Sequence, residues 1–143
     1  WLPVMDMLRI EKGGAAQLPD ELTAYNPLIP QGHELIATLM LAIEDAVIRD
    51  NIVLTLGGIE ETITLDIGAA RIKARPAEYG DRTTADGKTS SVHWLRFSFT
   101  PEQIATFKSG EHSAVLGIAH ANYGHMAVIP AAARAELAKD FAA

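Results

Sequence analysis

The stretch TITLDIGAARIKAR, residues 62 to 75, decides the fold class of this chain. Polar and apolar residues alternate with a period of two in each half of the stretch, which is typical of strands that bury one face. The apolar positions are Ile63, Leu65, Ile67, Ala70, Ile72 and Ala74. Gly68 separates the two halves, so the stretch predicts two half-buried strands that meet in a hairpin.

Similar reasoning extends outward along the chain. In residues 34–43, apolar residues occur at both the odd-numbered and the even-numbered positions, which predicts a strand buried on both faces. Thr100, Pro101 and Gln103 have the spacing of a helix N-cap, a first-turn proline and a capping box. The remaining expected elements are strands at 92–99, 113–120 and 125–129, helices at 1–12, 44–56, 101–109 and 131–141, and a proline-containing connector at 18–32 with one helical turn at 20–25.

These elements predict an α+β fold in which one mainly antiparallel sheet has helices packed against it. The length of 143 residues suits one core. We therefore expect residues 1–143 to form a single domain.

Composition excludes several classes of function. The net charge of −6 argues against sequence-independent binding of nucleic acid, because such binding needs a basic surface. Without cysteine, the chain has no disulfide, thiolate cluster or thiol nucleophile. Its longest strongly apolar run, Leu35–Ile43, is about half as long as a membrane-spanning helix requires. No secretory signal is visible, so we expect a cytoplasmic protein that contacts no membrane.

Common phosphate-binding, dinucleotide-binding and hydrolase motifs are absent, and a group of histidines is the strongest candidate site. If residues 121–124 form a four-residue hairpin loop, His120 and His125 become cross-strand neighbours. His93 lies on an apolar strand face and can join them. Three imidazoles, or two with a carboxylate such as Glu11, suit iron or zinc. One alternative is that His120 and His125 supply a general acid and a general base. Another is that each histidine has only a structural role.

The basic row Arg71, Lys73 and Arg75 is explained most simply as a solvated strand face, with anion binding as the alternative. Trp94 and Arg96 lie on the strand face opposite His93. A cation–π contact between them, or a pocket wall, is one reading, and core packing of Trp94 is the other.

Four stretches together resemble one uncharacterised bacterial family, domain of unknown function 3501. They are MLRIEK at 7–12, YNPLIP at 25–30, SVHWLRF at 91–97 and the segment that holds His120, Tyr123 and His125. The resemblance covers about residues 5 to 130. It implies a further N-terminal segment in other members, and it gives weight to Glu11, His93, His120, Tyr123 and His125.

The resemblance also implies a context, because genes of this family often lie beside genes for rubrerythrin-like proteins and iron–sulfur oxidoreductases. The leading hypothesis is therefore an accessory or ligand- or partner-binding domain of a cytoplasmic redox or oxidative-stress system. Its partner would be a rubrerythrin-like or iron–sulfur protein, and the chain could also form a homo-oligomer. The rival hypothesis is a His-ligated metal-binding protein or a metal-dependent enzyme, with His93, His120 and His125 as ligands and Glu11 and Tyr123 as neighbours.

Overall fold

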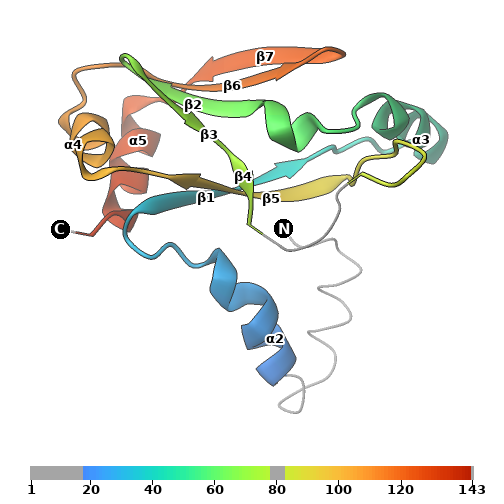
Figure 1. The fold of residues 1–143 in the computed structure, drawn as a ribbon, viewed down its shortest axis with the longest axis horizontal. Helices are drawn as coiled ribbons and strands as arrows, with labels where there is room; N and C mark the ends of the chain where they lie inside the picture. Colours follow the sequence, from blue (N-terminus) through green and yellow to red (C-terminus); the bar gives the residue numbers. More distant parts are fainter. Residues whose placement is uncertain (1–17, 78–82, 143) are drawn as a thin grey trace.

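The computed structural model describes residues 18–77 and 83–142, and Figure 1 shows their arrangement. In chain order the elements are α2 (Leu18–Tyr25), the 3-10 helix η2 (Asn26–Leu28), β1 (Glu34–Met40), α3 (Ala46–Thr55), the 3-10 helix η3 (Ile59–Thr62), β2 (Ile63–Ile67), β3 (Ala70–Lys73), β4 (Arg75–Pro76), β5 (Val92–Ser98), α4 (Pro101–Ser109), β6 (Ala114–His120), β7 (Tyr123–Val128), α5 (Ala131–Leu137) and the 3-10 helix η4 (Ala138–Asp140). The predicted α+β class is confirmed.

The described strands form two antiparallel sheets, so the prediction of one sheet was wrong. The first sheet has the order β1-β5-β4 and the second the order β3-β2-β6-β7. The predicted hairpin at Gly68 is present, with Leu65 paired to Ile72. Alternation shows which side of a strand faces the core, but it does not show which strands share a sheet.

The chain crosses between the two sheets at Ala74. The Ala74 amide donates to Ile63 O at 2.9 Å, which keeps it beside β2, whereas the next residue, Arg75, pairs with Arg96 of β5. Ala74 is almost completely buried at this corner. One run of chain therefore supplies an edge strand to each sheet and links the two layers.

The core lies between the two sheets and is built from their alternating apolar positions. Its buried members are Leu35, Ile63, Leu65, Ile67, Ile72, Ala74, Leu95, Phe97, Phe99, Phe107, Ala114 and Phe141. In Figure 1, α4 and α5 lie at one end of the two layers and α3 lies at the other. Phe99, Phe107 and Phe141 meet edge to face at the α4 end, with ring centroids 4.7–5.8 Å apart.

Local signals at the helix ends explain where α3 and α4 begin. The Asp45 side chain accepts from the Ile48 amide at 2.9 Å, which caps α3. The predicted capping box of α4 is confirmed: the Thr100 hydroxyl accepts from the Gln103 amide, and the Gln103 side chain accepts from the Thr100 amide. Gly110, in the left-handed conformation, ends α4.

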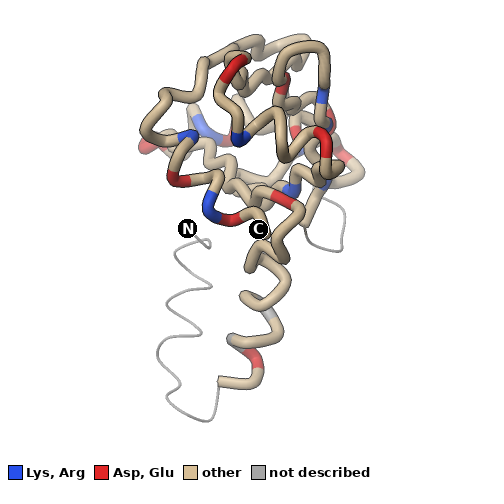
Figure 2. Tube along the Cα trace, turned by 90° about the vertical axis from the view of Figure 1, so that its left-hand side faces the viewer, with Lys and Arg blue, Asp and Glu red and all other residues tan. Residues whose placement is uncertain are grey.

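The N-terminal connector is fixed to β5 by one arginine. Arg96 Nη1 lies 2.5 Å from Glu34 Oε1, and Arg96 Nη2 donates to Pro27 O at 2.6 Å. Two of the stretches that resemble the family, at 25–30 and 91–97, therefore meet at this contact. Beyond it, α2 stands away from both sheets (Figures 1 and 2), and Leu18 and Leu22 are about half exposed.

Several predicted boundaries differ from the structure. The helical turn expected at 20–25 begins earlier, at Leu18, and the helix expected at 131–141 ends as α5 at Leu137. The strand expected at 34–43 ends at Met40. It lies at a sheet edge and is buried mainly at its start, so the prediction of burial on both faces was wrong. The helix predicted at 1–12 lies outside the described residues.

No helix within the described ranges is long and apolar enough to span a membrane. Acidic and basic residues are interspersed along the part of the body that faces the viewer in Figure 2.

Candidate functional site

The hairpin that carries the predicted histidines has a shorter turn than expected. His120 pairs with Tyr123 and Ile118 pairs with His125, so the turn consists of Ala121 and Asn122 alone. The predicted four-residue loop was therefore wrong, and His125 is not opposite His120. Because paired residues point to the same side of a sheet, the two histidines still share a face as diagonal neighbours.

His93 is the most deeply buried of the three histidines, with 1% of its surface exposed. Its Nε2 lies 2.9 Å from Ser90 O and 3.3 Å from the Thr89 hydroxyl. Its Nδ1 lies 3.8 Å from Glu60 Oε2. Leu95 and Phe97 on the same strand face are buried too, so the apolar face predicted for His93 is confirmed. The imidazole nitrogens nevertheless lie near polar groups from η3 and from the loop before β5.

Glu60 is the residue of this group that sequence reasoning missed. Its Oε2 is buried and has no hydrogen-bond partner among the described residues. Glu60 follows Gly57 and Gly58 at the start of η3, where an acidic side chain normally faces solvent. The hydrophobic periodicity of the sequence therefore gave no sign that Glu60 is buried. Burial of a carboxylate is costly unless another group compensates the charge.

His120 connects the hairpin tip to the segment that follows α3. The Asn122 amide donates to His120 Nδ1 at 3.1 Å, so Nε2 carries the proton and donates to Gly57 O, also at 3.1 Å. The Asn122 side chain adds a bond to Thr55 O at 2.8 Å. Both ring nitrogens of His120 are therefore engaged by the backbone, which is the arrangement expected of a structural histidine.

His125 and Tyr123 lie on β7, and all six residues of this strand are exposed. Their rings are 6.4 Å apart between centroids. Among residues 18–77 and 83–142, no group of three His, Asp or Glu side chains is placed so that it could hold one metal ion. Glu11, the predicted carboxylate neighbour, lies outside the described residues.

One face of the β6–β7 hairpin is apolar and uncovered. Leu116 pairs with both Leu65 of the core and Ala127 of β7, so these residues point to the same side of the sheet. Leu65 is 2% exposed, whereas Leu116 is 37% exposed. The layer that buries Leu65 therefore does not cover Leu116 or β7, although Ile118 on the same side still packs against the core. We call the uncovered residues on this side the hairpin face: Leu116, Tyr123, His125 and Ala127.

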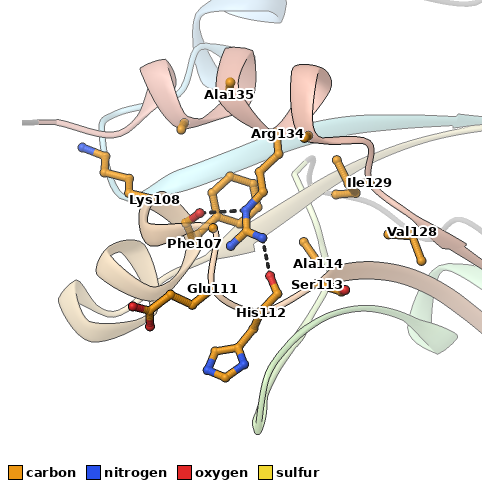
Figure 3. Close-up of a pocket in the computed structure, with 13 residues that line it drawn as sticks. Phe107, Lys108, Glu111, His112, Ser113, Ala114, Val128, Ile129, Arg134 and Ala135 are labelled. Atoms are coloured by element: carbon orange, nitrogen blue, oxygen red, sulfur yellow. Dashed lines mark hydrogen bonds between the residues drawn. The ribbon is translucent and has the colours of Figure 1, made fainter.

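A pocket of about 400 Å³ lies between the end of α4, the loop after it and α5 (Figure 3). Buried Arg134 projects into it from α5. Its Nε and Nη2 donate to Phe107 O and Thr106 O at 2.8 and 3.0 Å, and its Nη1 donates to His112 O. The guanidinium also lies over the Phe107 ring. Arg134 thus satisfies the carbonyls at the end of α4 and ties α5 to that helix.

The predicted basic row is largely paired with acidic neighbours. Arg71 makes two hydrogen bonds to Asp66, and Lys73 lies 2.7 Å from Glu61. The hydrogen bonds from Arg71 lower the pKa of Asp66 below its ordinary value. These pairs favour the solvated-face interpretation of the row. Trp94 is buried, as its core-packing interpretation requires.

Comparisons with known proteins agree with this fold. A family model described as protein of unknown function (DUF3501) matches residues 1–141. A crystal structure of a protein of unknown function from Burkholderia pseudomallei is similar to this chain, with 34% identity and a TM-score of 0.81. The match covers 96% of this chain and 72% of that one. No curated protein matches the chain.

Proposed function

The chain belongs to the DUF3501 family of proteins of unknown function, and from this premise and its own surfaces we propose a non-catalytic accessory domain that binds another protein. The hairpin face is the observation that carries the proposal. It continues the core side of the second sheet into solvent, with Leu116 37% and Tyr123 46% exposed. Burial of a large apolar side chain contributes about 1.5–3 kcal/mol, so a partner that covers this face gains from each such residue.

The partner class comes from the family resemblance. It points to a rubrerythrin-like or iron–sulfur protein of a redox or oxidative-stress system, and therefore to the cytoplasm. The hairpin face has the composition that such docking needs, because it combines apolar side chains with one tyrosine and one histidine. Tyr123 can contribute a large apolar ring and a hydroxyl at once.

The test is a binding measurement with defined partners. The untagged chain is titrated by calorimetry against a purified rubrerythrin-like protein and, separately, an iron–sulfur oxidoreductase from the same gene cluster. We expect one of them to bind, and Tyr123→Glu to weaken that binding at least tenfold. Val47→Glu is the control, because Val47 is an exposed apolar residue of α3 and is not part of the hairpin face.

Two results would count against the proposal. If neither protein binds, the redox partner is wrong. If the isolated chain turns over a substrate efficiently, the accessory role is wrong.

A second candidate function is metal binding, with iron or zinc and possible enzymatic use, and Glu60 is what favours it. Glu60 Oε2 and His93 Nδ1 are 3.8 Å apart. Ligand bonds to zinc are about 2.0–2.2 Å long, so one ion could contact both atoms. For this candidate we propose His93 and Glu60 as two of the ligands. For His120 and His125, the other predicted ligands, the ligand role stays a prediction.

Metal analysis of untagged protein purified without chelator tests this candidate. If it is correct, iron or zinc is present in stoichiometric amount and is lost in Glu60→Gln. Loss in His120→Ala or His125→Ala as well would include these histidines among the ligands. Protein that takes up neither metal under reducing conditions would remove the candidate.

A further inference from the structure

We propose that β7 pairs with β7 of a second copy of this chain, antiparallel and about a two-fold axis at Met126. The two second sheets then form one continuous sheet across the dimer. This goes beyond the proposed function, because it uses the outward backbone groups of β7, whereas the hairpin face uses side chains of β6 and β7. The argument has four parts: backbone direction, charge, Gly124 and register.

Backbone geometry shows which residues are available at the edge. The Ile129 amide donates to Ala114 O at 2.8 Å, in register with the β6–β7 pairs. In an antiparallel ladder such hydrogen-bonded positions alternate with positions that turn their backbone groups to the other side. Gly124, Met126 and Val128 therefore direct their N–H and C=O groups away from β6, towards the open edge.

The two edges of the second sheet differ in charge. β3 is short and carries Arg71 and Lys73, the kind of charged residues that keep an exposed edge from pairing with another chain. Residues 121–130 contain no Asp, Glu, Lys or Arg, although the chain carries a net charge of −6. The β7 edge is thus a neutral strip along which two acidic copies can approach without like charges meeting.

Nothing in the described part of one copy requires a glycine at position 124. Gly124 is not among the glycines with positive φ, and a Cβ at this position would meet nothing within 4 Å. Glycine in a strand interior is unfavourable, and it often marks a place where another backbone approaches closely. Gly117, in contrast, lies under the Met126 side chain, with 3.6 Å between its Cβ position and Met126 Cγ.

A two-fold axis at Met126 satisfies these features together. It places Met126 opposite Met126 of the second copy and Gly124 opposite Val128 of the second copy. Every outward backbone group of the three even-numbered residues then has a partner, and the missing side chain of Gly124 leaves room for the exposed Val128. A six-residue strand pair makes a small interface, so we expect the dimer to dissociate on dilution.

Light scattering coupled to size exclusion, over a range of protein concentrations, tests the pairing. At high concentration the mass should reach twice the 15.4 kDa of the chain. Met126→Lys should remain a monomer throughout, because two ammonium groups would face each other at the axis. Val47→Lys is a matched control, since Val47 and Met126 are each 72% exposed, and it should dimerise like the wild type.

A cross-linking experiment covers the case in which Met126→Lys fails to fold. The chain has no cysteine, so Met126→Cys and Val47→Cys each introduce a single thiol. A short thiol cross-linker should give a covalent dimer from Met126→Cys only. Wild-type protein that stays monomeric at every concentration, or equal cross-linking from both variants, would overturn the pairing. Tyr123 also lies on β7, so Tyr123→Glu is sized by light scattering and Met126→Lys is titrated against the redox protein as well. Loss of only one of the two interactions in each variant keeps failure of the redox partner and failure of the dimer separable.

Discussion

His120 forms hydrogen bonds with two backbone groups through the two nitrogens of its imidazole. It accepts from the amide of the hairpin turn and donates to Gly57 O, so it connects β6 to the segment after α3. His125, only five residues later, lies exposed on the neighbouring strand. Two histidines that look equivalent in the sequence therefore have different roles.

We expect His120→Ala to lower the free energy of unfolding by about 1–3 kcal/mol, because it removes two hydrogen bonds. His125→Ala should change it by less than about 0.5 kcal/mol, as is usual for an exposed side chain. Urea denaturation of both variants measures the difference. Equal effects would show that the contact of His120 with Gly57 contributes little.

Asp66 gives the clearest dependence on pH. Its hydrogen bonds from Arg71 lower its pKa in the folded state below the unfolded value. The pair therefore stabilises the fold above the unfolded pKa, and this contribution disappears as the pH falls through the lowered folded value. We expect Arg71→Gln to raise the Asp66 pKa towards its ordinary value, measured by NMR titration of the carboxyl group. An unchanged titration would show that the pair is not maintained in solution.

At the scale of elements, the sequence predicted local features such as caps and tight turns better than it predicted which strands pair. The α4 capping box and the Gly68 hairpin followed from the residues at fixed offsets. The β6–β7 turn did not, because Gly124 suggested a loop although it lies within a strand and has no positive φ. Burial of Glu60 was not predictable either, since it depends on η3 packing near His93, far along the chain.

Arg134 joins α5 to α4 by donating hydrogen bonds to three backbone carbonyl groups. We expect Arg134→Met to keep the apolar stem and to lower the free energy of unfolding by about 2–4 kcal/mol, because three carbonyl groups lose their donor. Arg75→Met, at an exposed position of β4, is the control and should have little effect. Thermal or urea unfolding compares them, and similar losses in both would contradict the role of Arg134.

At the scale of the molecule, two sheets replace the predicted one because the chain turns a corner at a buried alanine. Ala74 continues the alternation of its strand, so its residue type gives no sign that the next residues join another sheet. In the same two-layer arrangement all six residues of β7 are exposed, and no strand of the described residues pairs with its outer edge. Its exposure therefore follows from the architecture and could not be predicted from the composition of the strand.

Amide hydrogen exchange along β7, followed residue by residue at increasing protein concentration, tests most directly whether this strand pairs with another chain. The amides of His125 and Ala127 face β6 and should be protected at every concentration. Those of Gly124, Met126 and Val128 face the open edge, and their protection should rise with concentration as the dimer forms. Rapid, concentration-independent exchange of these three amides at concentrations up to the highest measured would contradict pairing along β7.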